Sequence, residues 1–138
     1  MGGKTMPQSR IHPDGSITQL MHDILQAAQQ VHDELGPCFE ERVYLRALDV
    51  ELHARGLAFK REEALPVLYR DRHVGKIRAD FLVADVLVGL RVQESLRETD
   101  VLRMRSCLKV AGRQAGLLLN FGAGELEVER LILHSEQE

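Results

Sequence analysis

The chain has 138 residues, 44% of them hydrophobic and 28% charged, which is the composition of an ordinary globular protein. A single domain of this length can bury a hydrophobic core without disulfide bonds or a structural metal. A net charge of −3 is not typical of a general nucleic-acid binder, although a local basic surface is compatible with it. No apolar run approaches the roughly 20 residues of a membrane-spanning helix, so we expect no membrane association. Cys38 and Cys107 lack the spacing of a metal pair, and without a secretory signal we expect small core residues in a reducing cytoplasm.

The two ends of the chain differ from its middle. Residues 1–15 are polar and contain two prolines, so we expect a flexible N-terminal tail. A single domain is predicted over residues 16–134, with a short tail at 135–138.

Two helices are predicted to open this domain. Ser16 and Gln19 form a capping-box pattern, and apolar residues recur at helical spacing over residues 16–35. Gly36 ends this helix, and the same periodicity predicts a second one over residues 39–55.

The apolar period then changes to two, which predicts strands. We expect strands at residues 57–60 and 64–69, a polar turn at 70–73, and a β-hairpin over 75–93. One face of the first hairpin arm is predicted to carry Ile77, Ala79, Phe81 and Val83.

The hairpin register follows from its turn. With residues 84–85 as a two-residue turn, Val83 pairs with Val86, and Asp80 lies opposite Gly89. A carboxylate at such a position is the kind of group with which metal-dependent nucleases hold Mg²⁺ beside a phosphate.

A third helix and two further strands complete the chain. We expect a helix at 99–111, a strand covered on both faces at 115–120, a turn at 121–124 and a last strand at 126–133. Two helices, a meander, a crossover helix and two strands predict an α+β or mixed α/β fold.

Three segments resemble the bacterial GxxExxY family, a branch of the PD-(D/E)XK nuclease-like superfamily. They read LGPCFEERVYLRAL, GLAFKREEALPVLYRDRHVGKIRADFLV and LKVAGRQAGLLLNFG, and the likeness extends from Thr18 to Leu133. The resemblance implies a restriction-endonuclease-like core, which is a mixed β-sheet flanked by helices with metal-binding acids projecting from its centre.

The positions that the resemblance marks as functional are only partly kept. Glu41 and Tyr44 retain the ExxY motif, and Asp80 retains the first metal acid, whereas Cys38 replaces the glycine of the family's name. The vestigial site that the resemblance implies comprises Glu41, Asp80, Gly89 in place of a glutamate, Arg91 in place of a lysine, and Arg103 in place of a glutamine.

These departures weaken the chemistry of the site. Gly89 offers no metal ligand, and the wide, permanently charged fork of Arg91 is a poor substitute for an ammonium group. Because Arg91 is a diagonal neighbour of Asp80, we predict an ion pair between them in the metal space. Glu41 and Asp80 with waters are an alternative Mg²⁺ site, and a helix-to-sheet hydrogen-bonding role for Glu41 and Tyr44 is a second alternative.

The function predicted from the sequence is that of a catalytically inactive nuclease-fold protein that self-associates into a homo-oligomer without a cofactor. One alternative is a nucleic-acid-binding module. Its candidate contacts are Arg70, Arg72, Lys76 and Arg78. The other is a residual Mg²⁺-dependent nuclease that uses Glu41 and Asp80.

Overall fold

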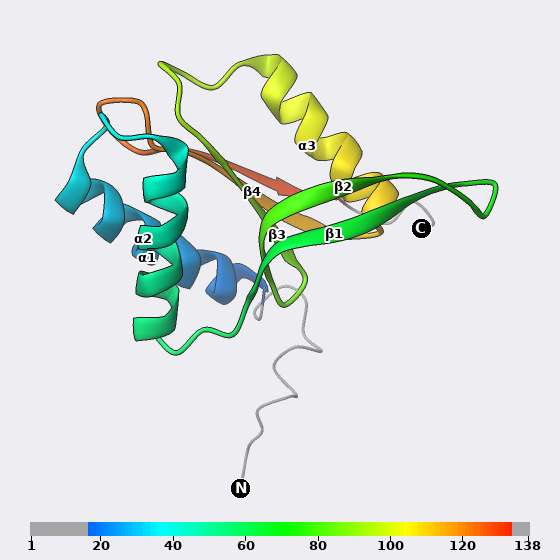
Figure 1. The fold of residues 1–138 in the computed structure, drawn as a ribbon, viewed down its shortest axis with the longest axis horizontal. Coiled ribbons are helices and arrows are strands. Elements are labelled where there is room, and N and C mark those ends of the chain that lie inside the picture. Colours follow the sequence, from blue (N-terminus) through cyan, green and yellow to red (C-terminus); the bar gives the residue numbers. More distant parts are fainter. Residues whose placement is uncertain (1–16, 134–138) are drawn as a thin grey trace, which may run out of the picture.

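The computed structural model describes residues 17–133, and the elements run in the order ααβββαββ (Figure 1). The predicted tails and the capping residue Ser16 lie outside the described residues. The helices are α1 (Thr18–Leu35), α2 (Glu41–Ala54) and α3 (Glu98–Ala111). The strands are β1 (Lys60–Tyr69), β2 (Arg72–Val83), β3 (Val86–Arg91), β4 (Ala115–Asn120) and β5 (Glu127–Ile132).

The five strands form one mixed sheet in the order β1-β2-β3-β4-β5. Strands β3 and β4 are parallel, and the other three neighbouring pairs are antiparallel. The parallel pair requires a crossover, which α3 provides. This mixed sheet with three helices confirms the predicted α+β class and is consistent with a restriction-endonuclease-like fold.

Helices cover both faces of the sheet, and each face has its own apolar cluster. Alternate residues of β3 and β4, such as Val88 and Leu117, pack with α1 and α2. Their sequence neighbours Leu87 and Leu118 pack with α3 on the opposite face. All six residues of β4 are buried, which confirms the prediction of a strand covered on both faces.

The first β-hairpin is longer than the sequence predicted. One continuous β1 replaces two predicted strands, and the turn consists only of Arg70 and Asp71, both with positive φ (51° and 64°). These are the angles of the turn that matches the twist of paired strands, so β1 and β2 pair up to the turn itself. The resulting two-stranded ribbon projects beyond the rest of the sheet (Figure 1).

The face of the sheet on which alternate apolar residues of β2 pack changes along the strand. Phe81 and Val83 pack on the face of α1 and α2 as their alternation requires, but Ile77 and Ala79 pack with the α3 cluster. The prediction that all four share one face is therefore wrong. The change occurs at Asp80, where β2 separates from β3.

The two cysteines are not core residues as predicted. Cys38 is exposed in the loop between α1 and α2, and Cys107 on α3 is half-buried. Among the helices of residues 17–133, none is both long and apolar enough to cross a membrane.

Candidate functional site

Asp80 lies at the point where the β2–β3 ladder ends. The ladder pairs Val83 with Val86 and continues to Phe81 with Val88, as the predicted register requires. Continuing it would bring the backbone of Leu90 beside β2, yet the Asp80 carboxylate accepts the Leu90 N–H at 2.8 Å instead. The side chain thus replaces a strand partner, and this allows β2 to bend away while the buried Leu90 N–H stays satisfied.

Burial raises the pKa of two carboxyl groups in this region, those of Asp80 and Glu41. Burial raises the pKa of Asp80 above 3.8, and the hydrogen bond from Leu90 together with the Arg91 charge opposes that rise. Desolvation also raises the pKa of Glu41 above 4.5, and the negative charge of Asp80 adds to it. Glu41 lies at the start of α2 and lines a different pocket from Asp80, so the Glu41–Asp80 alternative stays a prediction.

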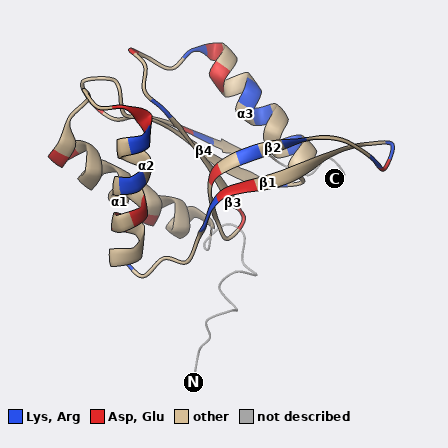
Figure 2. Cartoon of the chain, viewed as in Figure 1, with Lys and Arg blue, Asp and Glu red and all other residues tan. Residues whose placement is uncertain are grey.

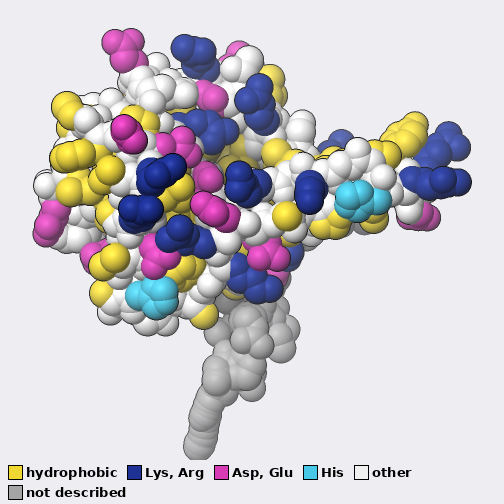
Figure 3. Space-filling view, viewed as in Figure 1, with side chains coloured by type: hydrophobic (Ala, Val, Ile, Leu, Met, Phe, Trp, Pro, Cys, Tyr) yellow, Lys and Arg dark blue, Asp and Glu magenta, His cyan; other side chains and the backbone are white. Residues whose placement is uncertain are grey.

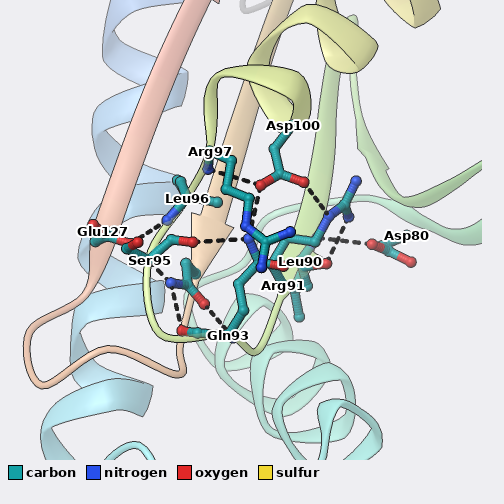
Figure 4. Close-up of polar contacts among 10 residues, drawn as sticks. Asp80, Leu90, Arg91, Gln93, Ser95, Leu96, Arg97, Asp100 and Glu127 are labelled. Carbon is teal, nitrogen blue, oxygen red and sulfur yellow. Dashed lines mark hydrogen bonds and ion pairs between the residues drawn. The ribbon is translucent and has the colours of Figure 1, made fainter.

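Arg91 does not pair with Asp80, so the predicted ion pair is wrong. Its Nη1 donates to the Leu90 carbonyl at 2.8 Å, and its Nε lies 3.7 Å from Oδ1 of Asp100. Figure 4 shows the two sides of this arrangement, with Asp80 reaching the backbone at Leu90 and Arg91 directed toward Asp100. Asp100 comes within reach because α3 packs over the sheet.

Asp100 is the site residue that sequence reasoning missed. It accepts hydrogen bonds from the Arg97 N–H at 2.9 Å and from the Gln93 side chain at 2.7 Å. The Arg97 N–H at the start of α3 is the main reason that the pKa of Asp100 lies below 3.8, and the Gln93 bond and Arg91 charge add to the effect. An acid in the first turn of a predicted helix is the signal that could have identified it.

The space beside Gly89 is filled by other side chains. A Cβ at Gly89 would lie 3.1 Å from the Met104 methyl, 3.4 Å from Leu118 Cδ1 and 3.9 Å from Arg91 Nη1. Met104 belongs to α3, and Leu118 belongs to β4. The position at which a second acid would project is thus bordered by an apolar wall and a guanidinium, and the Met104 methyl would have to move by a few tenths of an ångström to admit a side chain.

A pocket of about 230 Å³ lies next to this wall. Its polar lining consists of Asp80, Arg78, Arg91, Arg103 and Cys107. The structure therefore brings the vestigial residues Asp80, Gly89, Arg91 and Arg103 together around one pocket. The pocket is rich in cations and holds one acid.

The donor set does not fit a catalytic Mg²⁺ ion. Mg²⁺ prefers oxygen ligands in octahedral geometry, commonly from carboxylates and phosphate. One Asp80 oxygen is committed to the Leu90 N–H, and Asp80 is the one acid in the lining of the pocket. Within residues 17–133, no three His, Cys, Asp or Glu side chains converge on one point.

Tyr44 stabilises the loop that precedes α2. Its hydroxyl donates to the Gly36 carbonyl and accepts the Phe39 N–H at 3.2 Å. The ring is fully buried and stacks on Phe121 with 4.8 Å between centroids. The predicted helix-to-sheet hydrogen bond is therefore wrong for Tyr44, because its polar contacts stay within the α1–α2 loop.

A turn after β4 holds the segment that leads into α3. The buried Asn120 side chain accepts the Gln93 N–H and donates to the Gln93 carbonyl, both at 2.9 Å. Gly122 passes so close that a Cβ there would lie 2.7 Å from the Gln93 carbonyl oxygen. The two hydrogen bonds from Asn120 hold the backbone of Gln93 in place, and the Gln93 side chain donates a hydrogen bond to Asp100.

The four nucleic-acid candidates spread along the ribbon. Arg70 and Arg72 lie at its tip, Lys76 lies further along β2, and Arg78 alone among them lines the pocket. Figure 2 shows that Lys and Arg also occur along α3, which packs on one face of the sheet.

The mixed sheet, its covering helices and an aspartate at the strand bend define a protein of the restriction-endonuclease-like class. The family model for the PD-(D/E)XK nuclease superfamily matches residues 18–131, so the chain belongs to this superfamily. No curated protein and no solved structure matches the chain.

Proposed function

We propose that this protein is a nuclease-fold member of the GxxExxY branch that has lost metal-dependent phosphodiester hydrolysis and serves as a self-associating module. The observation that carries the loss of hydrolysis is Gly89 itself, which places no ligand on the pocket wall beside Asp80, while Nη1 of Arg91 lies 3.9 Å from the point where a Cβ would project.

The lost hydrolysis follows from what the superfamily's reaction requires. A bound Mg²⁺ polarises the phosphate and lowers the pKa of the attacking water, and it is held by one or two carboxylates together with the substrate phosphate. In this chain Arg91 brings a fixed positive charge to the same region, which repels a divalent cation. Arginine also cannot lose a proton, so it cannot exchange a proton with the attacking water as a lysine can.

Two observations favour self-association over nucleic-acid binding. The composition counts against a single-stranded nucleic-acid partner, and the exposed apolar surface counts for a protein partner. Base-stacking platforms for single strands require aromatic side chains, and the whole chain has four Phe, two Tyr and no Trp. Several large apolar side chains are more than half exposed. Such exposure favours a protein partner.

The test of lost hydrolysis is a cleavage assay with DNA and RNA substrates in Mg²⁺ or Mn²⁺. We expect no cleavage by the natural protein. Cleavage that disappears in Asp80→Ala would overturn the proposal, because it would show a working site at Asp80.

A restoration experiment makes the same test in the other direction. The double variant Gly89→Glu with Arg91→Lys supplies the missing groups, and the flexible Met104 end can yield the few tenths of an ångström required. Its matched control is Gly89→Gln with Arg91→Lys, which has the same bulk without the charge. Cleavage by the first variant and not by the control is the expected result.

A second candidate function is nucleic-acid binding without cleavage. It is favoured by the pocket, where Arg78, Arg91 and Arg103 surround a single aspartate. Phosphate contacts of this kind give affinity that falls steeply with salt concentration. Fluorescence anisotropy at low salt should show weaker binding for Arg78→Gln and Arg103→Gln, with Arg55→Gln just after α2 as the control.

A further inference from the structure

The tip of the β1–β2 ribbon combines apolar and basic side chains in an exposed position. We define the arm as residues 67–76, which include the turn at Arg70 and Asp71. The exposed fractions of Leu68, Tyr69 and Val74 are 53%, 65% and 60%. The arm also carries three Lys or Arg residues against one acid, and Figure 3 shows Lys or Arg side chains at its outer end.

A groove between α1 and α2 has the complementary character. It measures about 260 Å³. Its lining consists of Gln30, Val31, Glu34, Leu35, Ala47, Val50 and Glu51. Val50 is 67% exposed, so the groove presents an apolar side chain to solvent, and two acids are also part of its lining.

These two surfaces hold the four most exposed large apolar side chains of residues 17–133. The charge of the groove is also opposite to that of the arm. Helix α1 has three acids and no Lys or Arg, and Glu34 lies in the groove itself, whereas the groove's other acid, Glu51, pairs with Arg55 at 2.8 Å. The arm is apolar and basic, and the groove is apolar and carries acids. The two surfaces therefore complement each other in hydrophobic character and in charge.

The arm cannot reach the groove of its own chain. Helices α1 and α2 lie at one end of the molecule, and the arm projects from the opposite end (Figure 1). Any contact between the two surfaces must therefore join two copies. The groove is also smaller than the roughly 300 Å³ at which small-molecule pockets begin, so it fits one or two side chains better than a ligand.

We propose that the arm of one copy docks into the α1–α2 groove of a second copy, so that the chain associates head to tail. This inference rests on the proposed self-association and names its interface. Because the two contacting surfaces are different, a pair of copies keeps one free arm and one free groove. Repetition then yields either a closed ring or an open filament.

The experiment compares molar mass by light scattering over a range of micromolar concentrations for the full chain and three variants. Val50→Lys places a cation in the groove, and Tyr69→Glu places an acid on the arm. Leu102→Lys is the control, because Leu102 on α3 is 51% exposed and lies outside both surfaces. Circular dichroism confirms that each variant is folded.

The expected result is that the natural chain and the Leu102→Lys control assemble, whereas Val50→Lys and Tyr69→Glu are each monomeric. An equimolar mixture of these two variants should then form a dimer and nothing larger. The mixture contains one intact arm and one intact groove, so only a head-to-tail contact restores pairing.

Three results would overturn the inference. A natural chain that stays monomeric removes the contact altogether. Assembly that survives Val50→Lys but not Tyr69→Glu means that the arm meets a surface other than the groove. A Tyr69→Glu variant that loses nucleic-acid affinity at unchanged mass assigns the arm to nucleic acid. The cleavage assay is independent of all three, so lost hydrolysis and arm docking fail separately.

Discussion

The hydrogen bond between Asp80 and the Leu90 N–H allows a sharp test of the structural role of this aspartate. Replacing Asp80 with alanine removes the acceptor and leaves the N–H of a fully buried residue without its partner. Replacing it with asparagine keeps an oxygen in the same place and removes the charge. The two variants therefore separate the acceptor role from the charge.

The expected magnitude follows from the cost of an unsatisfied buried donor. Losing that partner costs about 1–3 kcal/mol of the free energy of unfolding. For 138 residues, an unfolding entropy of roughly 2 cal/mol/K per residue converts each kcal/mol into about 3–4 °C of Tm. Asp80→Ala should therefore lower Tm by about 3–10 °C.

Asp80→Asn should be at least as stable as the natural chain at neutral pH. Burial raises the pKa of Asp80 in the folded protein, so ionising this group opposes folding. The natural chain loses stability relative to Asp80→Asn as pH rises from 3.8 through the higher folded pKa. At neutral pH the full effect is present.

Thermal and urea unfolding measured between pH 3 and pH 8 provide the assay. Asp85→Ala in the neighbouring turn is the control, because its side chain is 76% exposed and its contact with Arg113 is a surface ion pair. An Asp80→Ala variant as stable as this control would refute the reasoning. A large loss of stability in Asp80→Asn would refute it as well, since it would show that the charge is required.

Three further predictions concern the surrounding framework. Asp100→Asn should destabilise α3 by about 0.5–2 kcal/mol at neutral pH, because it weakens the bond to the Arg97 N–H, and urea unfolding should show the difference shrinking as pH falls below 3.8. Tyr44→Phe should cost about 1–2 kcal/mol by thermal unfolding, since the Gly36 carbonyl loses its donor, and no loss would contradict the structural role of this hydroxyl. Gly122→Ala should cost about 1–3 kcal/mol or more, because its methyl would overlap the Gln93 backbone, and an unchanged Tm would contradict that close approach.

Local signals predicted the elements and the register of the second hairpin. The period of two over residues 75–93 and a two-residue turn place Val83 opposite Val86, and the structure confirms this pair. Gly36, with φ of 75°, ends α1 as predicted. These features depend on residues close in sequence, so a pattern is sufficient to predict them.

The bend at Asp80 could not be predicted from alternation. A strand pattern assumes that the backbone partner persists, whereas the Asp80 side chain replaces it and allows Ile77 and Ala79 to pack toward α3. Whether Arg91 pairs with Asp80 or with Asp100 could not be predicted from the sequence either. It depends on where α3 lies over the sheet, and that position is set by packing between distant segments.

The space at Gly89 is likewise shaped by packing. The sequence alone shows that an acid is missing, and the structure adds that Met104 and Leu118 border the space from two other elements. The missing ligand is the reason to expect weak metal binding, and these neighbours are what a restored side chain would have to displace. Only the first could be predicted from the sequence.

Calorimetric titration with Mn²⁺ tests the central claim most directly, with the natural chain and Asp80→Asn measured side by side. We predict no binding that differs between the two proteins, because Asp80 serves the Leu90 N–H and no second acid opposes it at Gly89. Stoichiometric binding to the natural chain that disappears in Asp80→Asn would contradict the claim.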